Sequence, residues 1–125
     1  MSTQPAPVTR TLSQEQLHRY ADASRDHNPI HVDPEFARAT PFGGTIAHGM
    51  LVLAMIGEMM YAACGDDWLS SGRMKVRFKA PARPGDIVTA SASATAPGER
   101  AWVVQCANER GEVLIEGRAS IGGAS

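Results

Sequence analysis

The sequence has few cysteines and no long apolar segment, and both shortages exclude whole classes of protein. Its 125 residues contain two cysteines, Cys64 and Cys106, and no Cys-x-x-Cys pair, so neither a disulfide framework nor a zinc knuckle is indicated. No apolar run reaches the ~18–20 residues that a membrane-spanning helix needs. A net charge of −1 argues against general affinity for nucleic acid. We therefore expect a globular protein that acts without a membrane or a nucleic acid.

The N-terminal segment lacks the apolar core of a signal peptide. Residues 1–10 are rich in Pro and Thr and carry a single charge, at Arg10, and we expect them to form a flexible tail. Residues 11–125 have the length of one domain. Without a signal for export, the cytoplasm is the expected compartment.

Helix signals dominate the first half of the chain. Ser13 and Gln16 have the spacing of a capping box, which predicts a helix over residues 14–24. Further along, an aspartate followed by a proline predicts a short helix over residues 34–39, with Asp33 as its N-cap. A catalytic role is the alternative for this aspartate.

The most apolar segment runs from Ile46 to Tyr61 and favours a buried central helix. It follows a loop over residues 40–45 and is expected to end near Cys64, with Gly65 as the C′ residue. Its four methionines are more typical of core packing than of a cofactor site. Glu58 interrupts the apolar run, and it is either exposed, buried at an interface or a catalytic acid.

The second half of the chain changes to the two-residue period of β-strands. Apolar and basic residues alternate up to residue 79, which predicts a half-buried strand with a basic outer face. That face consists of Arg73, Lys75, Arg77 and Lys79. It is either solvated or helps to hold a phosphate-bearing substrate. Three more strands are predicted over residues 87–95, 101–107 and 113–121. Helices followed by antiparallel strands indicate an α+β fold, in which one sheet wraps round the apolar helix.

An acid and an imidazole stand five residues apart in Asp26-His27-Asn28-Pro29-Ile30-His31. Five is not a helical spacing, and the proline disfavours a helix through the segment, so a turn must bring Asp26 and His31 together. A hydration or dehydration needs one group that takes a proton from water and another that supplies a proton to carbon. The residues alone leave open that Asp26 caps the turn while His31 is a packed polar residue.

Glycines lead into the apolar helix in the segment Gly43-Gly44-Thr45-Ile46-Ala47-His48-Gly49-Met50. Unpaired amides at a helix N-terminus suit an anion or a developing oxyanion, such as the polarised carbonyl of a thioester. Glycines at such a position also serve simply to let the chain turn, and the pattern does not decide between the two.

A metal site is a third possibility. His27 and His31 are four residues apart, and Asp33 and His48 would have to join them from elsewhere in the chain. Pro29 lies between the two histidines and prevents the helical presentation that His-x-x-x-His metal sites use. We assign no metal on this basis.

Three segments together resemble the MaoC-like family, whose best-known members are the (R)-specific enoyl-CoA hydratases. They are residues 20–33 with the core D-x-N-P-x-H, residues 42–50 and residues 76–86. The resemblance spans most of residues 12–121. It implies a hot-dog fold, an antiparallel sheet wrapped around a long central helix, normally paired as a dimer.

The resemblance also implies an activity. The catalytic Asp and His of the family fall on Asp26 and His31, its oxyanion-hole amide falls on Gly49, and Asn28 is expected to support the turn. The implied reaction is reversible addition of water to a trans-2-enoyl thioester of coenzyme A or acyl carrier protein. We expect a homodimer that uses no cofactor. His48 stands where the family also accepts glutamine and is given no role.

Two departures from the family pattern leave questions open. The glycine commonly found before the motif aspartate is Arg25 here, a cation that would favour ionised Asp26 if it turned inward. Ala54 and Gly57 stand where some hydratases place a hydroxyl, which leaves the acyl chain length open. The alternative functions are a hot-dog acyl-CoA thioesterase with Glu58 as its carboxylate, and a non-catalytic partner subunit of a heterodimeric dehydratase.

Overall fold

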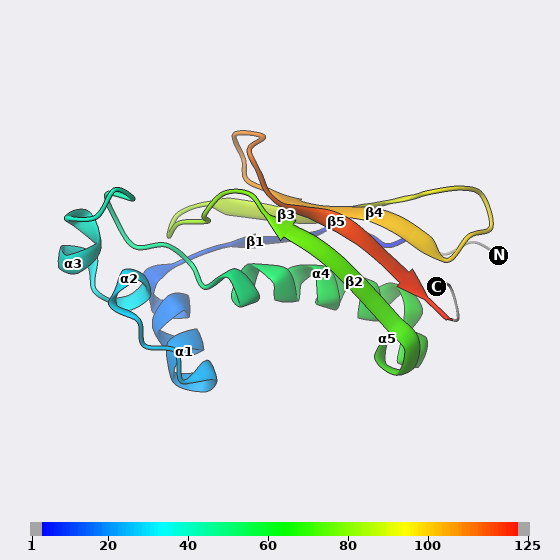
Figure 1. The fold of residues 1–125 in the computed structure, drawn as a ribbon, viewed down its shortest axis with the longest axis horizontal. Coiled ribbons are helices and arrows are strands. Elements are labelled where there is room, and N and C mark those ends of the chain that lie inside the picture. The colour runs from blue at the N-terminus through cyan, green and yellow to red at the C-terminus, as the bar shows by residue number, and fades with distance from the viewer. Residues whose placement is uncertain (1–3, 123–125) are drawn as a thin grey trace.

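A computed structural model describes residues 4–122 as a five-stranded antiparallel sheet with one long helix along its face (Figure 1). The strands are β1 (Val8–Thr11), β2 (Gly72–Phe78), β3 (Ile87–Ala94), β4 (Ala101–Ala107) and β5 (Val113–Ile121), in the spatial order β1-β3-β4-β5-β2. The helices are α1 (Gln14–Ser24), α2 (Pro29–Val32), α3 (Pro34–Arg38), α4 (Gly49–Cys64) and α5 (Asp66–Ser71). The predicted α+β fold, a sheet with a long central helix, is confirmed.

The core lies between α4 and the sheet. One cluster of buried apolar side chains combines α4 with β3, β4 and β5, and α4 contributes Val52, Met55, Ile56, Met59 and Met60. Burying a side chain of this size stabilises the fold by about 1.5–3 kcal/mol. Core packing is thus confirmed for three of the four methionines, but Met50 is 60% exposed.

The central helix begins three residues later than predicted. The amide of Ile46 donates to the carbonyl of Ile30 over 3.1 Å, and the amide of Ala47 donates to that of Ala82 over 2.7 Å. These bonds hold the chain extended, so the helix begins at Gly49 with His48 as its N-cap. It ends at Cys64, as predicted.

The N-terminal residues differ from the flexible tail expected over 1–10. Val8 to Thr11 form β1, which pairs with β3. Thr9, for example, lies opposite Thr89, 80 positions further along the chain, and no local pattern reveals such a partner. Residues 1–3 lie outside the described part of the chain.

Local signals set the other helices. Ser13 Oγ accepts from the Gln16 amide, and the Gln16 side chain accepts from the Ser13 amide, both over 3.1 Å, which confirms the capping box of α1. Asp33 Oδ1 accepts from two amides at the start of α3, which confirms its role as a cap. The six-residue helix α5 was not predicted. The expectation of no helix in the Asp26–His31 segment is wrong for its second half, because Pro29 begins the one-turn helix α2, where its missing amide hydrogen is not needed.

Strand β2 lies at one edge of the sheet and carries the predicted alternation. Arg73, Lys75 and Arg77 are exposed, whereas Met74 and Val76 are half-buried. Phe78, the next apolar residue of the strand, departs from the pattern, because 53% of its surface is exposed. None of the helices within residues 4–122 is long and apolar enough to cross a membrane.

Candidate active site

The Asp26–His31 segment lies where α1, α2 and α3 gather at one end of the sheet, near the start of α4 (Figure 1). Helix α1 ends at Ser24, and its C-cap Arg25 has a φ of 61°, in the left-handed region. The Asn28 side chain then accepts from the Ile30 amide over 3.1 Å and caps α2, with Pro29 in its first turn. Asp26 therefore precedes a one-turn helix, and His31 is carried on it.

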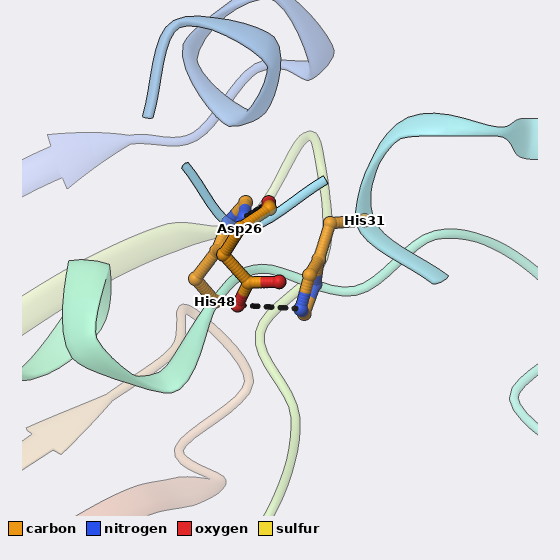
Figure 2. A group of neighbouring side chains, drawn as sticks. All are labelled: Asp26, His31 and His48. Carbon is orange, nitrogen blue, oxygen red and sulfur yellow. Dashed lines mark hydrogen bonds and ion pairs between the residues drawn. The ribbon is translucent and has the colours of Figure 1, made fainter. Parts of the chain in front are cut away.

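The carboxylate of Asp26 and the imidazole of His31 face each other, with Asp26 Oδ2 and His31 Nε2 3.9 Å apart (Figure 2). The other carboxylate oxygen accepts from the Asn28 amide over 3.3 Å. His31 Nδ1 lies 2.8 Å from the carbonyl of Ile46. Because a carbonyl only accepts, Nδ1 carries a hydrogen, and Nε2 is the nitrogen that faces Asp26.

His48 is the third member of this cluster. Its Nε2 lies 3.0 Å from the backbone carbonyl of Asp26, and its ring stacks on that of His31 with centroids 3.8 Å apart and 24° between the planes. The residue is buried to 2% exposure. The sequence alone gave it no role, although a polar residue between Ala47 and Gly49 at the start of an apolar helix is a signal of its own.

Three possible metal ligands lie within 4.8 Å of one another: Asp26, His31 and His48. They are not the set considered from the sequence, because His27 hydrogen-bonds Asp22 over 2.9 Å and Asp33 caps α3. The lone pairs of an imidazole lie in its ring plane, so two stacked rings do not aim at one ion as tetrahedral ligation requires. The arrangement favours proton transfer over metal binding.

His31 and Gly49 line the same cavity, which has a volume of about 370 Å³ and mostly apolar walls. Gly49 is the first residue of α4, and no acceptor in residues 4–122 receives its amide hydrogen. This amide lies at the positive end of a 16-residue helix. Phe78 fills the space beside its α-carbon, since a Cβ added to Gly49 would lie 3.0 Å from Phe78 Cε1.

Glu58 belongs to a different cavity, of about 350 Å³, lined among others by Tyr20 and Ala54. Its carboxylate is half exposed and forms an ion pair with Arg10. A half-exposed, paired carboxylate agrees with the expected exposed or interface position of Glu58. Beside Gly57, an added Cβ meets no atom within 4 Å, so this position has room for a larger residue.

Arg25 does not approach the dyad as a counter-ion. It is exposed, and no ion pair within 4.0 Å joins it to a carboxylate of the described chain. Its left-handed φ of 61° explains why a glycine suits the position before the motif aspartate, because glycine adopts this conformation without a Cβ penalty.

Comparison with known proteins identifies the family that the chain resembles. The sequence model of the MaoC like domain matches residues 2–114. The chain is 33% identical over 121 residues to the (R)-specific enoyl-CoA hydratase of Rhodospirillum rubrum, covering 94% of this chain and 84% of that protein. An R-hydratase structure from Pseudomonas aeruginosa superposes with a TM-score of 0.78 at 27% identity, over 97% of this chain and 80% of that one.

A second relative is more similar but matches less of its own length. The 3-hydroxyacyl-thioester dehydratase Z of Mycobacterium tuberculosis is 46% identical over 87 residues. This match covers 66% of the present chain and spans only 58% of that relative. The long central helix against an antiparallel sheet is thus the hot-dog fold expected from the sequence.

Proposed function

The chain belongs to the MaoC-like domain family, and from this premise we propose that it catalyses the reversible addition of water to a trans-2-enoyl thioester. One observation carries the proposal: Asp26 Oδ2 and His31 Nε2 face each other across 3.9 Å. On this assignment the enzyme is a hydro-lyase, an (R)-specific enoyl-CoA hydratase or 3-hydroxyacyl-thioester dehydratase, and its substrate is carried by coenzyme A or acyl carrier protein.

The separation of the two groups suits a shared water molecule. At 3.9 Å the pair is beyond the ~2.7–3.2 Å of a direct hydrogen bond, whereas one water between them reaches both. In hydration, the Asp26 carboxylate takes a proton from this water as the water oxygen bonds to the β-carbon. The electrons of the double bond move toward the thioester oxygen, and the His31 imidazolium gives its Nε2 proton to the α-carbon.

The step leaves Asp26 protonated and His31 neutral, and one proton returned from Asp26 to His31 resets the pair. Dehydration runs the same steps in reverse. The two groups exchange a single proton, so we assign the acid and base roles to the pair. The bond from His31 Nδ1 to the Ile46 carbonyl keeps the other nitrogen directed at Asp26 throughout.

Two further residues complete the proposed site. The Gly49 amide donates to the thioester oxygen as negative charge develops there, an interaction whose loss costs about 10²–10³-fold in rate. Asn28 supports the turn, because its side chain caps α2 while its backbone amide donates to the Asp26 carboxylate. Both contacts hold Asp26 on the His31 side of the turn.

The test is the loss of enoyl-thioester absorbance with purified protein. Asp26→Asn and His31→Asn should each lower kcat by about 10²–10⁴-fold, the usual contribution of an acid/base group, with an unchanged unfolding temperature. His27→Asn is the matched control, because His27 belongs to the same motif yet pairs with Asp22 on the surface. Wild-type rates in both dyad variants would contradict the assignment.

We also propose that the protein is a homodimer. Strand β2 is an open edge of the sheet, and large apolar side chains lie exposed at both its end and the start of α4, namely Phe78 and Met50. Two-fold pairing is the commonest assembly of soluble chains. A solution mass of twice the 13.3 kDa chain mass is expected, and a monomer at micromolar concentration would contradict it.

Neither alternative function gains support from the geometry. A thioesterase would need the Glu58 carboxylate, which is engaged by Arg10 and lies in the cavity that His31 does not line. A non-catalytic partner subunit would have no need of the facing Asp26 and His31 side chains.

A further inference from the structure

We propose that His48 is the positioning residue of the dyad: it fixes the backbone at Asp26, orients the ring of His31 and ties both to the start of α4. This inference rests on the proposed function, since the dyad it positions is the one assigned there. Figure 2 shows the three side chains converging from separate parts of the chain.

The first contact anchors Asp26 through its backbone. The Asp26 side chain is 54% exposed, so packing does not hold the carboxylate in place. The Asp26 amide makes only a long bond of 3.3 Å to Ser24 Oγ, whereas its carbonyl lies 3.0 Å from His48 Nε2, across 22 residues of sequence. The bond from His48 therefore ties the backbone of Asp26 to the N-cap of α4.

The chemistry of this bond fixes the tautomer of His48. A carbonyl oxygen only accepts, so His48 Nε2 carries the hydrogen and donates it. His48 Nδ1 is buried and finds no hydrogen-bond partner among the described residues. Its one bonded nitrogen is thus committed to the backbone of Asp26, which makes it a structural donor rather than a second acid or base.

The second contact orients His31. The two imidazole rings are stacked with centroids 3.8 Å apart, while the Ile46 carbonyl holds His31 Nδ1 in the ring plane. One face contact and one in-plane bond together define the direction of His31 Nε2. Tyr20 of α1 packs against His48 in an edge arrangement with centroids 4.8 Å apart and supports the ring in turn.

The third link is covalent. His48 is the N-cap of α4, and the next residue is Gly49, whose amide we assign to the thioester oxygen. The His48 side chain therefore links the acid/base pair to the helix end that carries the proposed oxyanion donor. Errors of about 1 Å in such an arrangement cost on the order of 10²-fold in rate.

Three variants separate this role from simple packing. His48→Gln keeps an N–H donor at nearly the distance of Nε2 from the backbone. His48→Asn also has an N–H donor, but its side chain is too short to reach the Asp26 carbonyl. His48→Leu removes the donor and keeps a side chain of similar size. We expect kcat to fall about 10²-fold in the leucine and asparagine variants with KM unchanged, and glutamine to restore most of it. Wild-type kcat in His48→Leu, an effect on KM alone, or glutamine as inactive as leucine would each overturn the inference.

A measurement on the unmodified protein covers the case in which His48→Leu fails to fold. In ¹⁵N spectra of histidine-labelled protein, His48 should show the Nε2–H tautomer, and His31 should carry a hydrogen on Nδ1. Nδ1–H at His48 would overturn the inference even if hydration is observed. Activity toward no enoyl thioester would instead overturn the proposed function, and the tautomer at His48 would still report on the bond to Asp26.

Discussion

Phe78 of β2 lies against Gly49 of α4, so close that a Cβ on the glycine would be 3.0 Å from the ring edge. The edge strand of the sheet thus meets the first residue of the central helix at the wall of the cavity that His31 lines. The space left by the missing side chain at Gly49 is occupied by this ring. The family resemblance implies that the same space lets a thioester approach the Gly49 amide.

This contact predicts a coupled pair of substitutions. Gly49→Ala should lower kcat/KM, because the new methyl group displaces Phe78 into the cavity or shifts the amide that donates to the substrate, at a cost of up to about 10²-fold. Phe78 is half exposed and its ring has room to move, so the unfolding temperature should change little. The measurement is the hydration rate across a range of enoyl-thioester concentrations.

The double variant distinguishes the two explanations for the glycine. If Phe78 occupies the space, Gly49→Ala combined with Phe78→Ala should recover activity relative to Gly49→Ala alone, as expected for contacting residues. Additive losses would mean that the substrate itself needs the space.

A second prediction concerns stability. Arg25 adopts a left-handed φ of 61°, a conformation that costs an L-residue roughly 1–2 kcal/mol and that glycine accepts freely. Arg25→Gly should raise the free energy of unfolding by about 1 kcal/mol, measured by urea denaturation, with hydration unaffected. Arg19→Gly is the control within α1, where glycine should lower stability by about 1 kcal/mol. A less stable Arg25→Gly variant would show that the left-handed strain is compensated.

A third prediction tests the thioesterase alternative. Glu58→Gln removes an ion pair between half-exposed partners, which is worth about 0–1 kcal/mol, and should leave the hydration rate near that of the unsubstituted protein. Thiol release from saturated acyl-CoA should stay at the background rate in both proteins. Rapid thiol release by the unsubstituted protein that disappears in the Glu58→Gln variant would favour the thioesterase.

The two cysteines should differ in reactivity. Burial raises the pKa of the Cys106 thiol to about 12, and burial also raises the pKa of Cys64, against the opposing effect of Arg100. Because the thiolate is the nucleophile, a thiol reagent at pH 8 should modify Cys64 alone in the folded protein and both cysteines after unfolding. Cys64→Ser should abolish the reaction of the native protein. Fast modification of Cys106 would show that the core opens readily.

The same shift has a consequence for stability at high pH. The folded state holds the Cys106 proton more tightly than the unfolded chain does. The contribution of this thiol to folding stability is therefore fully present below the ordinary thiol pKa. This contribution is lost as the pH rises from about 9 toward about 12. In urea denaturation, Cys106→Ala should show a weaker fall in unfolding free energy over this range.

Local patterns predicted the elements whose causes are local. The capping box at Ser13 and the proline after Asp33 predicted the starts of α1 and α3, and the two-residue period of the second half predicted β2, β3, β4 and β5. Each of these signals involves residues at most a few positions apart, so neighbours in the sequence suffice to recognise it.

The features that were missed depend on contacts across the chain. Strand β1 exists through its pairing with β3, and the late start of α4 follows from the bonds of Ile46 and Ala47 to distant carbonyls. The contact of His48 with Asp26 likewise needs the chain to return on itself. The motif therefore identified the candidate dyad, whereas its immediate surroundings required the folded structure.

The short strand at the N-terminus also determines how the sheet meets its surroundings. Four residues, Val8 to Thr11, cover the outer edge of β3, which would otherwise present unpaired backbone amides and carbonyls along an eight-residue strand. Exposed edges of this kind recruit strands from other molecules and lead to aggregation. A version of the protein that begins at Leu12 would keep every residue of the proposed site and yet leave the whole edge of β3 open to aggregation.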